Sequence, residues 1–445
     1  MIFKAYDVRG EYPKELNEDV IYKIGRAFAT FLGRKTTVAV GGDSRLSTPA
    51  LKKKFIQGLL DSGMDVVDIG MVPTPVVYFC GYKLGFEAAV EITGSHLTKE
   101  FNGMKFSGPG GIAISYEDGL KKVEEILKSC KFAEGEGKVI RKDVLPQYAE
   151  YMKSLGTNFS GIKIVVDGAN GAAGKLYSKI LRECGAEVVE MFCEPDGNFP
   201  NHTPDPMNKK FIKDLERKVK ELGADIGMAF DGDGDRLNIV DEKGLVANSN
   251  HIFSILAADV LKENPSGKIV HDVLCSKLVD DVIKSSGGTA ITSKVGHSII
   301  SKICLKENAV MAGEVSGHYF FKEANYTDDV LVACLKILKI MKEKNKSFSE
   351  LTRVFPKFFE ESNIRHPVKE DKKIIFIENL KQEFADKGYD IVTLDGVKVN
   401  FENGWMLFRP SNTEAKISFG YESSDREEFE KIKSIVAEIV KTIPQ

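Results

Sequence analysis

The segment DGDGDR, residues 231–236, places carboxylates at alternate positions: Asp231, Asp233 and Asp235. In an extended chain these side chains point to one side, where three like charges repel each other unless a cation lies between them. The two intervening glycines let the backbone curl around such an ion. Oxygen ligation favours Mg²⁺ or Ca²⁺ over Zn²⁺, and an open coordination position beside three carboxylates suits Mg²⁺ with a phosphate oxygen. The segment therefore predicts a magnesium site.

An EF-hand calcium loop is the rival interpretation, because Glu242 falls at the twelfth position of such a loop. Two features argue against it. The sixth position, where the EF-hand turn needs glycine, is Arg236, and the flanking segments have the pattern of strands instead of helices. A plain acidic hairpin turn remains the simple alternative.

A second polar loop, TGSHLTKEFNG at residues 93–103, carries Ser95 next to His96 between two strand-like segments. A serine in this setting is either a phosphoryl-bearing nucleophile or an ordinary turn residue. The loop alone does not decide between the two. Other polar loops in the chain are needed to choose between these interpretations.

Two further loops have the chemistry of sugar and phosphate recognition. GEVSGH offers Glu314, Ser316 and His318 at alternate positions, and a carboxylate beside a hydroxyl suits vicinal sugar hydroxyls. RPSNTE has the composition of a phosphate clamp, in which a guanidinium stands beside short hydrogen-bonding side chains. The clamp residues are Arg409, Ser411, Asn412 and Thr413. Taken singly, each motif is also compatible with an ordinary solvated turn.

The elements that must position these loops recur along the chain. TTVAVGGD (36–43), IKIVVDG (162–168) and GKIVHD (267–272) are each followed by a polar turn, a helical pattern and a second strand. Such β-α-β units predict mostly parallel sheets covered by helices. Each unit is followed by a strand, a polar loop and a second strand. The same strand–loop–strand pattern occurs a fourth time near the C-terminus. This recurrence predicts one cleft where all four loops meet.

Composition sets outer limits on the function. With 445 residues the chain is long enough for about three domains. Its net charge of -3 gives no basic field for nucleic acid or an anionic membrane, and no apolar run approaches a membrane span. The seven cysteines form no C-x-x-C pair, which favours a reducing compartment, and we expect the cytoplasm. The Gly-rich stretch 164–174 lacks G-x-G-x-x-G spacing and predicts a tight strand-to-helix turn, not a nucleotide loop.

Together, TGSH, DGDGDR, GEVSGH and RPSNTE resemble, in this order, the four active-site loops of the α-D-phosphohexomutases. The start FKAYDVRG and the stretches DGNFPNHTPDP and SKVGHSII extend the resemblance over nearly the whole chain, which is most similar to the phosphomannomutase/phosphoglucomutase branch. The resemblance implies an α/β protein of four domains around a central cleft. Three are related mixed-sheet α/β domains and the last is a smaller α+β domain. We expect their boundaries at 1–147, 148–246, 247–362 and 363–445.

The resemblance also implies a reaction, the reversible conversion of a hexose 1-phosphate of mannose or glucose into the 6-phosphate. Phosphorylated Ser95 would give its phosphoryl group to the sugar phosphate. The resulting 1,6-bisphosphate would turn around in the site and give its other phosphoryl group back to Ser95. Mg²⁺ would be held by the three aspartates and Ser95, with a hexose 1,6-bisphosphate as primer. The implied catalytic residues are Ser95, His96, Lys105, Arg236 and His318. The implied substrate-binding residues are Tyr6, Arg9, Lys294, His297, Glu314, Ser316, His318, Arg409, Ser411, Asn412 and Thr413.

Some points stay open at this stage. The general acid and base are Lys105, His96 or His318, and the preference between mannose and glucose is unassigned. The branch implies a monomer that acts on a small phosphosugar. Phosphoglucosamine mutases usually have Gln where Val315 stands, so GEVSGH favours glucose or mannose phosphates and leaves phosphoglucosamine mutase as the alternative. A nicotinamide dehydrogenase is disfavoured because its fingerprint is absent.

The serine loop departs from the family pattern. Leu97-Thr98 replaces Asn-Pro, Phe101 replaces a tyrosine, and Leu274 stands where a basic residue is common. Lys277 or Lys294 could supply the missing charge. Because of the altered loop, a weakly active or non-catalytic phosphosugar-binding protein is a further alternative.

Overall fold

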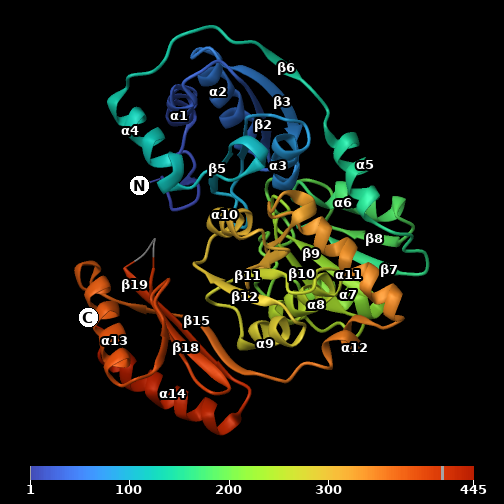
Figure 1. The fold of residues 1–445 in the computed structure, drawn as a ribbon. Coiled ribbons are helices and arrows are strands. Elements are labelled where there is room, and N and C mark those ends of the chain that lie inside the picture. Colours follow the sequence, from blue (N-terminus) through green and yellow to red (C-terminus); the bar gives the residue numbers. More distant parts are fainter. Residues whose placement is uncertain (1, 412–414, 445) are drawn as a thin grey trace.

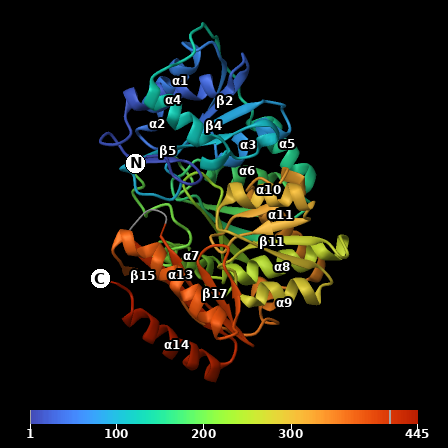
Figure 2. The same cartoon turned by 60° about the vertical axis from the view of Figure 1, so that its left-hand side comes forward.

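The computed structural model describes residues 2–411 and 415–444. Four sheets follow one another along the chain and lie in an arc, with the N-terminal part at the top of Figure 1 and the C-terminal part at the lower left. Figure 2 shows the second and third sheets packed closely, with the red C-terminal part set to one side.

The first sheet has six strands in the order β1-β5-β4-β2-β3-β6. Its strands are β1 (Val8–Glu11), β2 (Thr37–Gly42), β3 (Asp65–Met71), β4 (Ala88–Ile92), β5 (Phe101–Ser107) and β6 (Val139–Arg141). The accompanying helices are α1 (Glu18–Leu32), α2 (Thr48–Leu60), α3 (Thr74–Tyr82) and α4 (Lys121–Ser129).

The second and third sheets have four strands each, in the orders β10-β9-β7-β8 and β12-β11-β13-β14. The second comprises β7 (Lys163–Asp167), β8 (Glu187–Met191), β9 (Ile226–Phe230) and β10 (Leu237–Asp241), with α5 (Leu145–Leu155), α6 (Gly174–Glu183) and α7 (Lys213–Leu222). The third comprises β11 (Lys268–Asp272), β12 (Thr289–Ser293), β13 (Met311–Gly313) and β14 (Tyr319–Phe321), with α8 (Ser249–Glu263), α9 (Lys277–Ser285), α10 (His297–Glu307), α11 (Val330–Lys344) and α12 (Phe348–Thr352).

The same topology occurs in all three sheets. A central strand (β2, β7 or β11) pairs in parallel with the next strand of its unit and with the strand that carries the polar loop. The loop then turns back into an antiparallel partner. The sheets are therefore mixed, because the hairpin that holds each polar loop adds an antiparallel strand to a parallel core. Each loop leaves the carboxyl end of a parallel strand, the usual place for ligand sites in such sheets.

The fourth sheet is antiparallel throughout, in the order β15-β19-β18-β17-β16. Helices α13 and α14 pack against it, and Figure 1 shows them on the outer side of the C-terminal part. This is the smaller α+β domain that the resemblance implied. Its elements are β15 (Phe359–Pro367), α13 (Glu370–Asp386), β16 (Asp390–Val392), β17 (Val397–Asn400), β18 (Gly404–Pro410), β19 (Lys416–Ser423) and α14 (Arg426–Lys441).

The hydrophobic cores divide the chain unequally. One core joins the first three sheets and includes Phe79 of α3, Tyr148 of α5 and Leu335 of α11. The fourth sheet has a separate core built on Met406 and Phe408. A small hydrophobic cluster around Trp405 and the residues near Val273 joins it to the third sheet. The first three sheets thus form one body on which the C-terminal domain is docked.

Local sequence signals explain where elements begin and end. Asn17 accepts a hydrogen bond from the Val20 amide at the start of α1, and Gly33 ends that helix with φ of 70°. The strands that precede the first three polar loops are short and wholly buried, as in the case of IGMAF in β9. Within the part of the chain that the structure describes, no helix combines the length and apolarity needed to cross a membrane.

Candidate active site

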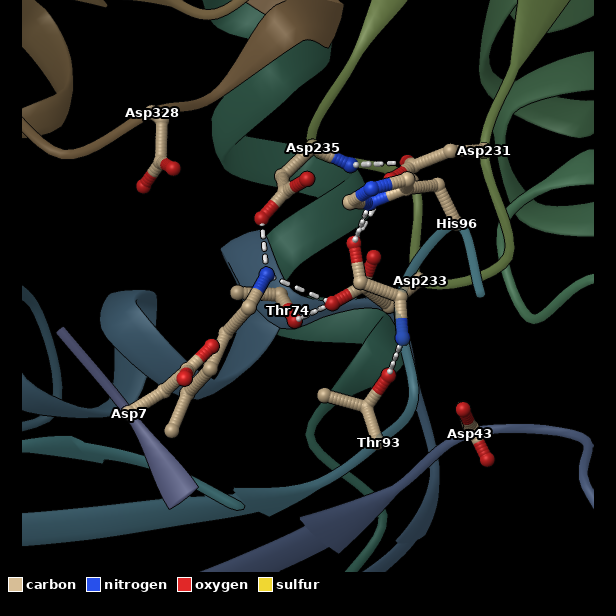
Figure 3. A network of polar contacts seen from close by, with 12 residues as sticks. Asp7, Asp43, Thr74, Thr93, His96, Asp231, Asp233, Asp235 and Asp328 are labelled. Carbon is tan, nitrogen blue, oxygen red and sulfur yellow. Dashed lines mark hydrogen bonds and ion pairs between the residues drawn. The ribbon is translucent and has the colours of Figure 1, made fainter. Parts of the chain in front are cut away.

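The three carboxylates of DGDGDR converge, but through a turn and not through an extended strand. The Gly234 amide donates to the Asp231 carbonyl over 3.2 Å, and Gly234 has φ of 71°, a left-handed value that favours glycine. Asp231, Asp233 and Asp235 are fully buried, and their oxygens lie within 4.8 Å of one another. Figure 3 shows them facing a common space.

These residues fit a divalent cation. Burial, and then the charges of Asp233 and Asp235, raise the pKa of Asp231 well above its usual value. The Oδ1 atoms of Asp233 and Asp235 are buried without a hydrogen-bond partner. A hard dication would remove the repulsion and use these free oxygens as ligands. The EF-hand interpretation is excluded by the flanking strands and by Glu242, which accepts hydrogen bonds from Ser347 and Ser349 at the start of α12.

Ser95 lies against the metal loop, although 136 positions separate it from Asp231. Its hydroxyl donates to Asp231 Oδ2 over 3.0 Å and lies 3.3 Å from His96 Nδ1. Ser95 has φ of 49°, a left-handed value that non-glycine residues rarely adopt, and such strain clusters at functional sites. The Asp231 acceptor aims the serine oxygen at the carboxylate cluster.

Arg45 anchors the serine loop, a role that the sequence analysis missed. Its buried guanidinium pairs with Asp43 at 3.0 Å and donates to the backbone carbonyls of four loop residues. These are Ser95, Leu97, Thr98 and Phe101, at 2.8, 2.7, 2.6 and 3.1 Å. Asp43 also accepts from the Gly94 amide over 3.0 Å. A buried arginine therefore fixes backbone that lacks the proline of related loops. The D-x-R pattern after strand β2 was the available signal.

Lys105 and the metal loop form a buried ionic cluster. Lys105 Nζ lies 2.6 Å from Asp233 Oδ2 and also contacts Asp235 Oδ2. Burial alone would lower the pKa of Lys105, but the two aspartates outweigh burial and raise it. Asp233 Oδ2 also accepts from the Thr74 hydroxyl over 2.7 Å, another contact that the sequence did not predict.

His318 and Arg236 also lie close to the cluster, with His318 Nδ1 3.8 Å from Asp235 Oδ1 and Arg236 Nε 3.9 Å from Asp231 Oδ2. Arg236 Nε donates to His318 Nε2 over 3.1 Å. His318 Nδ1 lies 3.1 Å from Asp328 Oδ2. Burial lowers the pKa of His318, but Asp235 and Asp328 outweigh it and raise the pKa. Asp328, which the sequence analysis did not select, thus stands behind the histidine.

His96 differs from His318 in the direction of its pKa shift. Burial, followed by the positive charges of Arg236 and Arg9, lowers the pKa of His96 well below its usual value. Burial likewise lowers the pKa of His297, whose ring stacks 6.2 Å from that of His318. The pKa shifts of His96 and His297 thus both favour the neutral imidazole.

The remaining predicted substrate residues take different positions. Tyr6 donates to the Val295 carbonyl over 2.5 Å and packs edge-on against His297. Arg9 donates to the Thr93 carbonyl and pairs with Asp7 at 2.8 Å, so it supports the serine loop. Lys294 is exposed.

The sugar loop is also a tight turn, closed by the Glu314 amide and the His318 carbonyl at 2.9 Å. Glu314 Oε1 accepts from the Gly296 amide over 2.8 Å, and burial raises the pKa of Glu314 to about 7. Ser316 lines the cleft and donates to Glu314 Oε2 over 3.5 Å, while Glu314 itself is buried.

A cleft of about 640 Å³ connects these groups with the C-terminal domain. The residues named so far that line it include Tyr6, His96, Arg236, Ser316, Arg409 and Ser411. Arg409 pairs with Asp395 at 2.9 Å. Asn412 and Thr413 lie outside the described residues. Lys277 pairs with Asp281 at 3.1 Å, and among the described lining residues neither Lys277 nor Lys294 occurs.

The turn 164–174 is the strand-to-helix connection that its glycine spacing predicted, running from β7 into α6. Its function is structural support of the metal loop. A Cβ atom on Gly171 would lie 2.6 Å from the carbonyl oxygen of Gly232. This contact requires glycine and leaves no room for a nucleotide phosphate between the two loops.

Comparison with known proteins places the chain in a family. Four models, all described as phosphoglucomutase/phosphomannomutase, match along it: α/β/α domain I at residues 1–134, domain II at 146–244, domain III at 248–358 and the C-terminal domain at 364–439. A phosphomannomutase/phosphoglucomutase of Pseudomonas aeruginosa is 37% identical over 445 residues, covering 99% of this chain and 96% of the relative. A phosphomannomutase of Methanocaldococcus jannaschii is 37% identical over 448 residues, covering 99% and 98%.

A solved structure agrees with this placement. The crystal structure of a phosphoglucomutase/phosphomannomutase family protein from Burkholderia thailandensis superimposes with a TM-score of 0.92 at 34% identity, covering 99% of this chain and 97% of that one. With matches over all four domains, the chain belongs to the phosphoglucomutase/phosphomannomutase family.

Proposed function

We propose a division of labour among these residues for the hexose phosphate mutase activity that family membership assigns to the chain. Ser95 carries the phosphoryl group, and the protein interconverts the 1- and 6-phosphates of glucose or mannose through a 1,6-bisphosphate. One observation carries the proposal. The hydroxyl of a strained, buried serine is aimed by Asp231 at a cluster of three carboxylates from another domain.

The reaction is a pair of phosphoryl transfers. In the first, the bond between phosphorus and Ser95 Oγ breaks while a bond forms between phosphorus and the free O6 or O1 of the sugar phosphate, whose hydroxyl loses its proton. In the second, the bisphosphate has turned, the bond between the other phosphorus and its sugar oxygen breaks, Ser95 Oγ accepts that phosphoryl group, and the sugar oxygen takes up the proton. Mg²⁺ held by Asp231, Asp233 and Asp235 would neutralise charge on the transferring group. Lys105 and Arg236 add positive charge at the same place.

We assign the proton transfer at the sugar hydroxyl to His318. Lys105 is held by two carboxylates that raise its pKa, so it keeps its proton and acts as a fixed charge. His96 has a lowered pKa and lies beside the serine oxygen, where it can hydrogen-bond to the phosphoserine. His318 has a carboxylate 3.1 Å from its Nδ1, which orients the imidazole, and its Nε2, which accepts from Arg236 Nε, is the nitrogen that can take up the proton.

The proposal also includes the metal, the primer, the cellular compartment and the oligomeric state. Mg²⁺ is the expected metal and a hexose 1,6-bisphosphate the expected primer, because loss of the intermediate would leave Ser95 without a phosphoryl group. All seven cysteines lie in the described part of the chain and are free, six of them buried, which supports a reducing, cytoplasmic setting. We expect a monomer, and gel filtration with light scattering checks this.

The experiment that tests the function joins intact mass with turnover. Wild-type protein should carry one phosphate on Ser95 and convert glucose 1-phosphate or mannose 1-phosphate with Mg²⁺ and the matching 1,6-bisphosphate. Ser95→Ala should lack the phosphate and lose turnover by several orders of magnitude, because no other residue takes the phosphoryl group. Ser129→Ala, which changes an exposed serine at the end of α4, is the control and should match the wild type.

Two results would change the assignment. Undiminished turnover in Ser95→Ala would reject Ser95 as the carrier. Tight phosphosugar binding without turnover in the phosphorylated wild type would favour the binding-protein alternative. Glucosamine 1-phosphate is assayed as a third substrate. Preferential turnover of this compound would favour the phosphoglucosamine mutase alternative.

A further inference from the structure

The wall of the cleft that the C-terminal domain contributes carries a second arginine in register with Arg409. Ser418 of β19 pairs with Arg365 of β15 on one side and with Arg409 of β18 on the other. Residues directly opposite each other on neighbouring strands project from the same face of a sheet. All three residues line the cleft. Arg365 was not among the residues that the sequence motifs selected.

On this wall, acidic and basic side chains lie in different rows of paired residues across the strands. Glu360 and Glu422, which also line the cleft, are opposite each other in another row of the same strands. Glu422 is already engaged there, because it accepts from the Ser276 hydroxyl over 2.8 Å and from the Lys277 amide over 2.9 Å. The row of Arg365, Ser418 and Arg409 is therefore the cationic end of the wall, and Ser411 also lines the cleft.

Arg409 alone does not balance a sugar phosphate. A phosphate monoester carries between one and a half and two negative charges near pH 7. Arg409 has one positive charge and shares it with Asp395 at 2.9 Å. Arg236, the other arginine among the described lining residues, is engaged with His318 beside the metal loop. A second cation at this end of the cleft would add to the charge balance of a dianionic group.

We propose that Arg365 is a second phosphate-binding cation, which grips the non-reacting phosphate of the substrate together with Arg409 over Ser418. The inference rests on the proposed function and deepens it, since it specifies a dianionic phosphomonoester as the group bound here. Neighbouring strands lie about 4.8 Å apart, so the backbones of the two arginines are about 10 Å apart across β19. Two long arginine side chains can meet a phosphate over that span, with the Ser418 hydroxyl between them.

The proposal also bears on Leu274. This residue lines the cleft where related enzymes often carry a basic side chain, and neither Lys277 nor Lys294 is among the described lining residues. Arg365 supplies a positive charge to the same cleft from the opposite domain. Substrate charge is then balanced from the C-terminal wall instead of the third domain.

The test measures binding without turnover. In the Ser95→Ala protein, isothermal titration calorimetry gives the Kd for glucose 6-phosphate. R365Q in this background should raise the Kd about tenfold or more, because a charge-assisted contact to phosphate is lost. R365K should lie between the two, since lysine keeps the charge but loses the bidentate fork. R353Q, which removes an exposed arginine that does not line the cleft, should leave the Kd unchanged.

A pH comparison separates a direct contact from a merely structural role. The phosphate of glucose 6-phosphate loses its second proton near pH 6. With two cations present, binding should tighten clearly from pH 5 to pH 8, and R365Q should flatten this rise. A structural defect would weaken binding by the same factor at both pH values.

The outcomes are distinct. If the Ser95→Ala protein binds glucose 6-phosphate and R365Q changes the Kd less than twofold, the inference is wrong and the proposed function stands. An equal loss at both pH values also overturns it. If wild type and Ser95→Ala neither bind nor turn over any phosphosugar, the proposed function fails and the inference fails with it.

Discussion

The hydroxyl of Ser95 donates a 3.0 Å hydrogen bond to Asp231 Oδ2, which joins the serine loop of the first domain to the metal loop of the second. The two loops also meet through their backbones. A Cβ atom on Gly232 would lie 2.6 Å from the carbonyl oxygen of Ser95. The reacting oxygen and the carboxylate cluster are thus held by a contact between domains, and the activity depends on how closely two loops from distant parts of the chain approach.

Gly232→Ala should therefore reduce turnover while the protein stays folded. The added methyl group meets backbone, which cannot rotate away, so the two loops must separate. We expect kcat to fall on the order of a hundredfold, in line with small displacements of reacting groups. Steady-state kinetics and circular dichroism measure the two effects. Gly108→Ala is the matched control, because its nearest neighbour would be 3.9 Å away, and equal kinetics in the two variants would contradict the prediction.

Arg45→Lys should loosen the serine loop. Lysine keeps the charge beside Asp43 but cannot donate to carbonyls in several directions at once. We expect kcat to drop about tenfold or more, with faster hydrogen exchange at residues 94–101. Arg34→Lys, at an exposed arginine paired with Glu87, is the control. Unchanged exchange in the loop would show that Arg45 does not anchor it.

Removal of divalent metal should abolish turnover and lower the melting temperature. Chelation leaves three buried carboxylates with Lys105 as their nearest countercharge. Mg²⁺ at a hundred times its Kd should stabilise the folded state by about 2.7 kcal/mol. Differential scanning calorimetry with and without Mg²⁺ records the shift, and Asp233→Asn should reduce it. A melting temperature that does not respond to Mg²⁺ would argue against a metal at this cluster.

Lys398→Met should weaken the docking of the C-terminal domain. Lys398 is buried, donates to the carbonyls of Val273 and Cys275 over 2.8 and 3.2 Å, and lies 4.6 Å from the ring centre of Trp405. Methionine fills the same space but leaves both carbonyls without this donor.

Trp405 is the single tryptophan of the chain, so its fluorescence reports on this interface directly. We expect a red-shifted emission and a larger radius of gyration in solution scattering. Lys387→Met, at an exposed lysine after α13, should change neither quantity. The same emission and radius in Lys398→Met and wild type would show that the contact does not hold the domain.

Asp329→Asn should change the pH dependence of stability. Burial raises the pKa of Asp329 to about 7, against the opposing hydrogen bond from Tyr148. The folded state therefore holds this proton more tightly than the unfolded chain does. The resulting stabilisation is complete below the unfolded pKa near 4 and is lost as the pH rises to about 7. Asparagine keeps the side-chain acceptor for the Leu331 amide and has no charge.

The difference in melting temperature between Asp329→Asn and the wild type should consequently increase in favour of the variant from pH 5 to pH 8. The corresponding change in the free energy of unfolding is at most about a few kcal/mol. Asp425→Asn is a matched control, since Asp425 caps α14 in the same way but is exposed. A difference that stays constant with pH would contradict the raised pKa.

Several features could be predicted from residues alone because they depend on local pattern. The β-α-β units, the strand–loop–strand segments and the strand-to-helix turn at 164–174 all follow from periodicity and glycine placement. The acidic cluster at Asp231 followed from the types and spacing of its residues. The sheets are mixed, as the resemblance implied, and the metal and sugar loops are tight turns, whereas the argument from alternate positions assumed an extended chain. Turn geometry depends on hydrogen bonds such as that from the Gly234 amide, which residue spacing does not specify.

The sequence by itself determined which chemical groups the protein possesses and the order of its four loops, because motifs are local in the chain. Only the tertiary structure decided which groups meet. Arg45 reaches the serine loop across about 50 positions, Asp328 comes to lie behind His318, and Arg365 comes into register with Arg409 through Ser418. Such contacts arise when separate strands and domains pack against one another. The contacting residues are far apart along the chain, so the sequence does not show that they are close in space. The serine of TGSH is therefore placed beside the metal loop by the packing of two domains, and not by its own neighbours in sequence.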